Sequence, residues 1–210
     1  MPSGAAGGTG GKGATGGQLP QLTAAQGRVS LAKLRPTVDA RIDLARARGK
    51  VAASTRAPSL MPAAGAPFGI YVGNVGHAKS LGVLREHGIG AVLNCAPGVC
   101  KDPTRAYRAA GIAYLELDAK DDRSFPLLER CLAPASEFIA GAHASQTNVL
   151  VHCMAGVNRS AAIVVAFLMC RDNRALLELF AECSAARPSI LQNASFQLQL
   201  CELALTKGLL

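Results

Sequence analysis

Tryptophan is absent from this chain of 210 residues, and aromatic residues make up only 4% of it. Any hydrophobic core must therefore be built from Leu, Val, Ile and Ala rather than from large rings. Apolar residues nevertheless account for half of the sequence, enough for a core of ordinary size. The length indicates one ordinary domain, or one domain with a tail.

Long apolar runs are also missing, and their absence bears on membrane association and targeting. No stretch of about 18 apolar residues occurs, so we expect no transmembrane segment. No apolar segment follows the start, which argues against a secretory signal. Pro2 replaces the glycine that N-myristoylation needs. We therefore expect a cytoplasmic or nuclear protein, unless the N-terminal segment directs it elsewhere.

Paired cysteine spacings are lacking as well. The seven cysteines are an odd number, which argues against a disulfide scaffold and for a reducing compartment. Cys95 and Cys100 are separated by four residues, but the second pair that a zinc site would require does not accompany them. We therefore expect no bound metal.

Acidic residues are scarce in the first third of the chain. Residues 1–66 contain nine Lys or Arg and two Asp, a net charge of +7 out of +8 for the whole chain. The first 20 residues are rich in glycine, a composition typical of flexible segments. We expect 1–66 to be a disordered, basic extension and 67–210 to be the folded domain. Such a basic extension can bind an acidic partner, nucleic acid or a membrane surface. It could equally be a targeting segment or a solvated segment without a binding role.

Helix-like and strand-like segments alternate after residue 67. This alternation predicts an α/β fold with a central, mostly parallel sheet flanked by helices, and a ligand site at the carboxyl ends of the strands. We expect strands over 70–72, 91–94, 112–117 and 149–152, and helices over 77–87, 103–110, 126–142, 159–171, 175–186 and 193–205.

The chemistry of the chain is concentrated between Val149 and Ser160. A short apolar strand is followed by a loop from Cys153 to Arg159, and then by a continuous apolar run typical of a buried helix. The loop can turn successive backbone N–H groups inward, and the helix N-terminus adds positive potential, so the loop suits a phosphate. Arg159 can grip two phosphate oxygens at once. The predicted phosphate-binding residues are Met154, Ala155, Gly156, Val157, Asn158 and Arg159.

Cys153 lies at the base of this predicted phosphate site. The inward N–H groups and Arg159 favour the thiolate, so the pKa of Cys153 should fall from about 8.5 into the range of roughly 3.5 to 7.5. Such a cysteine is a nucleophile at neutral pH, and Ser160 can donate a hydrogen bond to its sulfur. A lone cysteine in an apolar segment is usually a small buried hydrophobe, as we expect of Cys170 and Cys201.

The stretch from His152 to Ser160, His-Cys-Met-Ala-Gly-Val-Asn-Arg-Ser, resembles the signature of the cysteine-dependent protein tyrosine phosphatase superfamily, in its small, atypical dual-specificity branch. The resemblance covers about residues 67–206. It implies a fold like that of the protein tyrosine phosphatases, and hydrolysis of phosphotyrosine and of phosphoserine or phosphothreonine in proteins, through a phosphocysteine and without cofactor or metal. Four further segments resemble parts of that branch, 68–74, 88–96, 111–121 and 187–200.

A proton donor for the leaving oxygen is expected in the segment that follows strand 112–117. Asp118, Asp121 and Asp122 cluster there, and residue types alone do not choose among them. The resembled family places its acid seven residues after an aromatic that matches Tyr114, which selects Asp121. The resemblance implies that Asp121 protonates the leaving group and then activates the water that hydrolyses the phosphocysteine.

Two supporting residues are predicted around the loop, and a neighbouring cysteine has two possible roles. His152 is expected to orient the loop through a ring N–H rather than to transfer protons, and Asn94, at the end of its strand, to hold the loop by hydrogen bonds. Cys95, beside it, either resolves an oxidised Cys153 as a disulfide or is simply a packed apolar thiol. Both roles of Cys95 stay open.

Two positions depart from the family pattern. Asn158 stands where the branch usually has serine, and asparagine there resembles the RNA 5′-triphosphatases of capping enzymes, although these typically have threonine after the arginine and lack the acid. Ala155 stands where some relatives carry a charge that grips lipid or protein. Phosphoinositides and phosphoglucans therefore stay open as substrates. A catalytically inactive phosphate-binding module is a further alternative, but such members usually lack the cysteine or the arginine.

Overall fold

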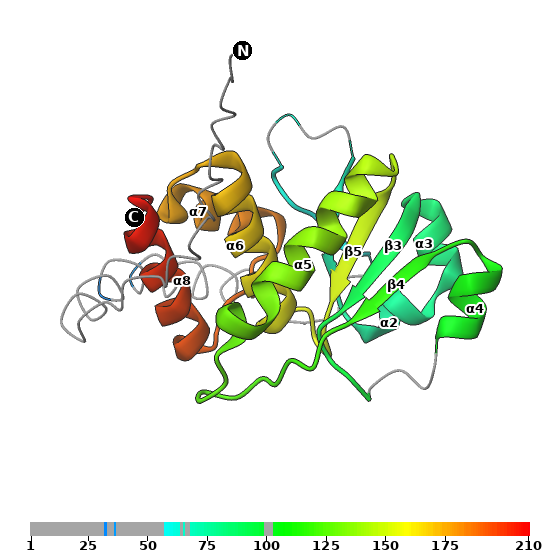
Figure 1. Cartoon of the computed structure of the whole chain (residues 1–210), viewed down its shortest axis with the longest axis horizontal. Helices are drawn as coiled ribbons and strands as arrows, with labels where there is room; N and C mark the ends of the chain where they lie inside the picture. Colours follow the sequence, from blue (N-terminus) through cyan, green and yellow to red (C-terminus); the bar gives the residue numbers. More distant parts are fainter. Residues whose placement is uncertain (1–31, 33–35, 37–56, 64, 66–67, 99–102) are drawn as a thin grey trace, which may run out of the picture.

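The computed structural model describes residues 32, 36, 57–63, 65, 68–98 and 103–210, with one five-stranded sheet at the centre (Figure 1). Four strands are parallel, in the order β2, β5, β3 and β4, and β1 pairs antiparallel with β2 at the edge. The predicted α/β fold with a mostly parallel sheet is confirmed. The strands are β1 (Ser59–Leu60), β2 (Ile70–Gly73), β3 (Ile89–Asn94), β4 (Ala113–Glu116) and β5 (Asn148–His152).

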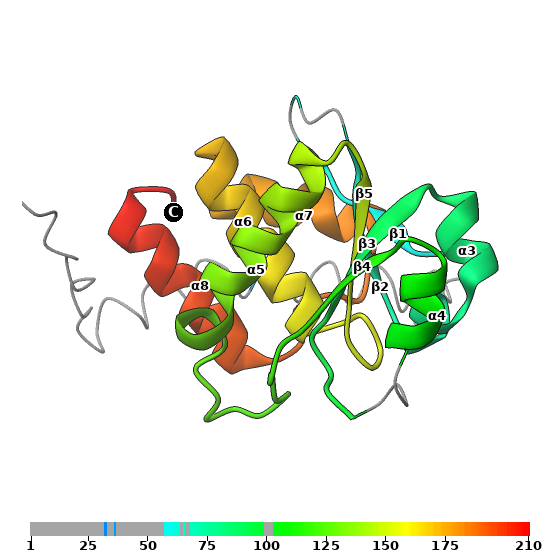
Figure 2. The ribbon, with the colours of Figure 1, turned by 45° about the vertical axis from the view of Figure 1, so that its right-hand side comes forward.

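Helices cover both faces of the sheet. Three short helices gather on one face, and four longer ones cover the other, as Figure 1 and Figure 2 show from two sides. The short helices are α2 (Val75–Lys79), α3 (Leu81–Glu86) and α4 (Thr104–Ala109). The longer ones are α5 (Leu127–Ala144), α6 (Arg159–Asp172), α7 (Leu176–Ala186) and α8 (Ala194–Lys207).

Successive side chains of the central strand β5 point to opposite faces of the sheet. Val149 and Val151 join the larger core beneath α5 to α8, and Leu150 joins the smaller core beneath α2 to α4. Helix α6 is buried at every position over 160–169, as expected of a helix that is apolar on all sides. This packing fixes the two elements between which Cys153 lies.

The structure corrects two of the predicted boundaries. The helix expected over 77–87 is divided at Ser80, whose backbone is extended and whose hydroxyl accepts a hydrogen bond from the N–H of Val83, capping α3. Strand β1 lies before residue 67, so the sheet includes residues that the sequence assigned to the extension. Most of 1–66 lies outside the described residues, and its disorder stays a prediction.

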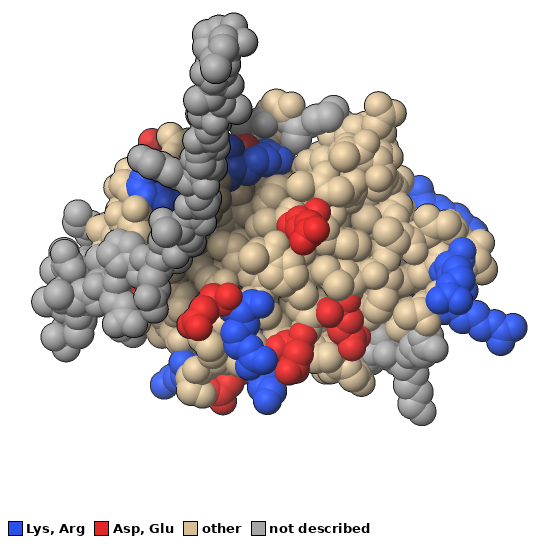
Figure 3. Space-filling model, in the orientation of Figure 1, with Lys and Arg blue, Asp and Glu red and all other residues tan. Residues whose placement is uncertain are grey.

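Charged side chains are spread unevenly over the surface shown in Figure 3. The area over α5 and β4 carries little charge, whereas acidic and basic side chains mix at the end of the molecule that carries the loop after β4. Where the structure describes the chain, no helix combines the length and apolarity that a membrane crossing requires. All six described cysteines are free thiols.

Candidate active site

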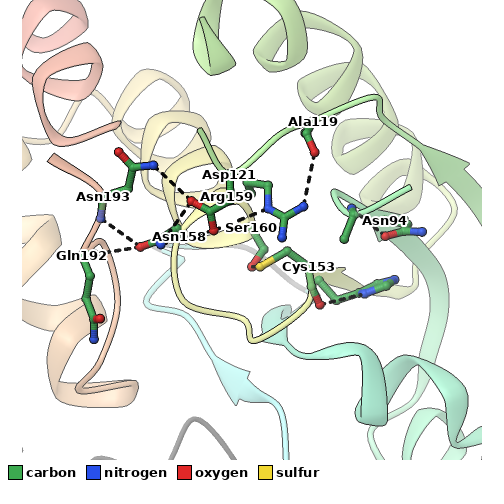
Figure 4. Close-up of polar contacts among 11 residues, drawn as sticks. Asn94, Ala119, Asp121, Cys153, Asn158, Arg159, Ser160, Gln192 and Asn193 are labelled. Carbon is green, nitrogen blue, oxygen red and sulfur yellow. Dashed lines mark hydrogen bonds and ion pairs between the residues drawn. The ribbon is translucent and has the colours of Figure 1, made fainter. Parts of the chain in front are cut away.

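The loop 153–159, called the phosphate loop from here on, leaves the carboxyl end of β5 and enters α6 (Figure 4). His152, the last residue of β5, is paired with Gly73 on one side and with Asn94 on the other, so the loop starts from the middle of the sheet. Gly156 has a φ of 68°, and a Cβ there would lie 2.4 Å from the carbonyl oxygen of Gly73. Only glycine fits this position without a shift of the backbone.

Cys153 lies at the floor of the phosphate loop with 1% of its surface exposed. Burial raises the pKa of the thiol, but nearby donors more than offset this effect. The hydroxyl of Ser160 lies 3.4 Å from Sγ, and the N–H groups of Ser160 and Val157 and the charge of Arg159 also favour the thiolate. The pKa of Cys153 is therefore lowered from its usual value, which makes the sulfur a nucleophile.

Arg159 lies over the sulfur of Cys153 in Figure 4. Its Nη1 donates a hydrogen bond to the carbonyl oxygen of Ala119 at 3.3 Å, and its buried Nε has no hydrogen-bond partner among the described residues. A buried donor left unpaired is costly, and in a site of this kind it is suited to an incoming anion. Nε is thus available for a hydrogen bond to a phosphate oxygen, and a guanidinium can bind two such oxygens side by side.

Asp121 is the acid of the expected cluster that the fold brings to the phosphate loop. Its carboxylate accepts hydrogen bonds from the side chains of Asn158 and Asn193, and Oδ2 lies 3.7 Å from Nε of Arg159. Asp122 instead binds the backbone N–H and hydroxyl of Ser124, contacts that lower its pKa. Asp118 is exposed. The geometry therefore selects the same carboxylate as the family resemblance.

His152 is buried beneath the phosphate loop. Its Nδ1 lies 3.4 Å from the carbonyl oxygen of Cys153, and its Nε2 finds no hydrogen-bond partner in the part of the chain that the structure describes. Burial lowers the pKa of His152 to about 4, with smaller lowering contributions from His77 and Arg159. The ring is therefore neutral at pH 7, as a residue that orients the loop requires.

The side chain of Asn94 makes its hydrogen bonds away from the phosphate loop, contrary to prediction. Its Nδ2 donates to the hydroxyl of Tyr114 and to Oε2 of Glu116, and its Oδ1 accepts from the N–H of Ala96. The side chain points along the sheet toward β4, so it fixes the turn after β3. The backbone of Cys95 makes the link to β5, with its N–H 2.7 Å from the carbonyl oxygen of His152.

Cys95 is fully buried at the end of β3. Burial raises its pKa well above the usual value, and the nearby charges of Cys153 and Cys131 raise it further. The two cysteines of the predicted pair are thus neighbours with opposite pKa shifts. Among the described residues, no group of three His, Cys, Asp or Glu side chains is placed to hold a metal.

Arg187, whose role the sequence did not reveal, holds the outer side of the phosphate loop. It is 3% exposed, and it donates from Nε to the carbonyl oxygen of Gly156 at 2.6 Å and from Nη2 to that of Ala155 at 3.1 Å. With these carbonyls turned outward, the N–H groups of the loop can face inward. An arginine before a proline at a helix end gives no local signal of a contact 31 residues away.

Comparisons with known proteins agree with this geometry. The family model described as "Dual specificity phosphatase, catalytic domain" matches residues 70–205. Dual specificity protein phosphatase 13B of Homo sapiens is 35% identical over 133 residues, which cover 62% of this chain and 67% of that protein. Dual specificity protein phosphatase 6 of Homo sapiens is 32% identical over 143 residues, which cover 68% of this chain and 36% of that protein.

A comparison with solved structures supports the same family. The crystal structure of human DUSP28 is similar with a TM-score of 0.58 and 28% identity, and the match covers 70% of this chain and 95% of that chain. The match to the catalytic-domain model covers more than half of the chain and contains both Cys153 and Arg159. The chain therefore belongs to the dual specificity phosphatase family, whose members are cysteine-dependent protein phosphatases.

Proposed function

We propose that the chain hydrolyses phosphotyrosine, phosphoserine and phosphothreonine in proteins through a phosphocysteine at Cys153. The observation that carries this proposal is that a thiol, a guanidinium and a carboxyl group lie together at the phosphate loop. A thiol of lowered pKa lies at its floor, the guanidinium of Arg159 lies above it (Figure 4), and the carboxyl group of Asp121 is held beside them, with Oδ2 3.7 Å from Nε of Arg159.

The reaction has two steps. The thiolate of Cys153 attacks phosphorus while the ester P–O bond breaks, and protonated Asp121 gives its proton to the leaving oxygen. Asp121, now a carboxylate, takes a proton from water, whose oxygen attacks phosphorus and releases Cys153. Arg159 and the N–H groups of residues 154–159 hold the phosphoryl oxygens in both steps.

The test is phosphate release from an aryl phosphate and from a peptide that carries phosphotyrosine and phosphothreonine. The wild type should release phosphate from both, Cys153→Ser from neither, and Asp121→Asn about 100-fold more slowly from the phosphothreonine peptide. Asp122→Asn is the matched control, because that carboxylate binds Ser124. A wild type that is inactive on both substrates would favour a phosphate-binding module.

RNA 5′-triphosphate is the second candidate substrate, and Asn158 together with the basic extension favours it. The contact between Asn158 and Asp121 counts against it, because the triphosphatases that Asn158 resembles lack that acid. Release of the γ-phosphate from a short triphosphorylated RNA, with no release of phosphate from the peptide, would favour RNA over phosphoproteins as the substrate. Activity on the aryl phosphate alone would favour phosphoinositides or phosphoglucans.

We also propose a compartment for the protein and a class of partner for residues 1–66. The seven cysteines, of which the six described are free, support a reducing compartment such as the cytoplasm or the nucleus. The net charge of +7 in residues 1–66 supports contact with an acidic protein, nucleic acid or an anionic membrane surface. Binding that persists in residues 57–210 alone, which keep β1 but lose all nine basic side chains, would contradict the second of these proposals.

A further inference from the structure

Amide groups surround Asp121 and join it to the phosphate loop (Figure 4). Nδ2 of Asn158 lies 3.2 Å from each carboxylate oxygen, and Nδ2 of Asn193 lies 3.1 Å from Oδ1. Asp121 belongs to a segment without helix or strand, and its side chain is 33% exposed. Its position therefore depends on these amides and on the ion pair with Arg159.

The orientation of the Asn158 amide is fixed by the backbone that follows α7. Its Oδ1 accepts hydrogen bonds from the N–H groups of Gln192 at 2.8 Å and Asn193 at 3.0 Å. Only the oxygen of an amide can accept, so the NH2 group must face Asp121. The side chain thus joins three parts of the chain: the phosphate loop, the acid-bearing segment and the start of α8.

The orientation of the Asn193 amide is fixed in the same way. Asn193 is the N-cap of α8, and its Oδ1 accepts a hydrogen bond from the N–H of Ser195 at 3.0 Å. Its NH2 group is therefore also turned toward Asp121. We call the side chains of Asn158 and Asn193, with the N–H groups of residues 192 and 193, the amide clamp.

The backbone before the clamp is held in an unusual conformation. Leu191 is fully buried with a φ of 57°, a left-handed conformation that costs a non-glycine residue about 1–2 kcal/mol. Its N–H donates to the carbonyl oxygen of Val157 at 2.8 Å, and its carbonyl oxygen accepts from Nε2 of Gln197 at 2.6 Å. These bonds hold the turn that presents two successive N–H groups to Asn158.

We propose that Asn158 is a positioning residue that presets Asp121 for proton donation, and that it thereby favours esters with poor leaving groups, phosphoserine and phosphothreonine. The proposal rests on the proposed function. Serine, usual in the resembled branch at this position, has a single short hydroxyl with one donor and cannot reach both the 192–193 backbone and the carboxylate. The departure at residue 158 thus changes how firmly the acid is held.

Esters with different leaving groups distinguish a role of Asn158 in positioning the acid from a general role in supporting the phosphate loop. An acidic phenol departs without a proton, whereas the hydroxyl of threonine requires one in the transition state. The ratio kcat/KM reports the first step, phosphoryl transfer to Cys153, for both kinds of ester. Loss of acid positioning should therefore lower kcat/KM for the alkyl ester selectively.

The experiment compares Asn158→Ser with the wild type on a phosphothreonine peptide and on a fluorinated coumarin phosphate. We expect kcat/KM to fall about tenfold or more on the peptide and less than about threefold on the coumarin ester. Asn193→Ser is the second variant, because serine still caps α8 but has no donor that reaches Asp121. Asn173→Ser, the same change at the exposed C-cap of α6, should leave both values unchanged.

Two results would overturn the proposal. Equal losses on both esters would mean that Asn158 supports the whole phosphate loop, and unchanged values on both would mean that the clamp does not act on the acid. Failure of the proposed function itself gives a different result, because the wild type would then be inactive on both esters or Cys153→Ser would be as active as the wild type.

Discussion

The hydroxyl of Ser160 lies against the sulfur of Cys153. This contact, together with the N–H of Ser160, contributes more than the charge of Arg159 to lowering the pKa of Cys153. Ser160→Ala removes a donor that stabilises the thiolate and not the thiol, so the pKa of Cys153 should rise. Alkylation by iodoacetamide at pH 6 should slow roughly tenfold, measured as the rate of inactivation across pH.

Ser184→Ala is the matched control for this prediction. Ser184 is also buried, but its hydroxyl donates to the carbonyl oxygen of Phe180 within α7. The pH dependence of alkylation should therefore stay that of the wild type. An unchanged pH dependence in Ser160→Ala would contradict the prediction and leave the backbone N–H groups and Arg159 to account for the reactive thiol.

Cys95 is expected to remain a packed thiol rather than to resolve an oxidised Cys153. Peroxide converts the Cys153 thiolate to a sulfenic acid with release of hydroxide. A disulfide would then require attack by the Cys95 thiolate on the sulfenic sulfur, which forms the S–S bond and releases hydroxide. Burial raises the pKa of Cys95, so little of that thiolate is present at pH 7. A peptide map after mild peroxide should show Cys153 oxidised alone, and a Cys95–Cys153 disulfide would contradict this.

At the scale of elements, Arg187 joins the end of α7 to the phosphate loop. Its guanidinium holds the carbonyl oxygens of Ala155 and Gly156, and its charge interacts favourably with a Cys153 thiolate. Arg187→Met keeps much of the buried volume but releases both carbonyls. We expect kcat/KM for an aryl phosphate to fall at least about tenfold and alkylation of Cys153 at pH 6 to slow, because the two charge-assisted hydrogen bonds to the phosphate loop are lost.

Arg174→Met controls for removing an arginine from the same region. Arg174 follows α6, where it forms an ion pair with the half-exposed Glu182. A pair of this kind contributes about 0–1 kcal/mol to stability, so activity should be retained. Equal activity of Arg187→Met and the wild type would show that the phosphate loop keeps its shape without the guanidinium.

Elements that are continuous in sequence could be predicted, and contacts between distant elements could not. The phosphate loop was recognisable because Cys153, Gly156 and Arg159 stand in one short segment between an apolar strand and an apolar helix. The clamp at Asn193 and the support from Arg187 depend on how the turn after α7 folds back, which no local pattern encodes. The division at Ser80 had a local signal, since serine favours N-caps, but apolar spacing on both sides concealed it.

At the scale of the whole molecule, His152 connects the active site to folding stability. It ends β5, the strand between β2 and β3, and only 1% of the residue is exposed. Burial lowers its pKa to about 4, whereas an unfolded chain gives histidine a pKa of about 6.5. Between these values the unfolded state binds a proton at this residue and the folded state does not.

This difference makes the fold less stable as the pH falls. The free energy of unfolding rises with pH wherever the unfolded state binds more protons, so the contribution of His152 is fully present above about pH 6.5 and is lost as the pH falls to about 4. The gap between the two pKa values corresponds to about 3 kcal/mol. His152→Gln should remove this part of the pH dependence, because glutamine does not titrate. Urea unfolding of both proteins at pH 7 and pH 4 measures this difference. Between these pH values the free energy of unfolding of the wild type should fall by about 3 kcal/mol more than that of the variant. Equal losses would mean that folding does not lower the pKa of His152.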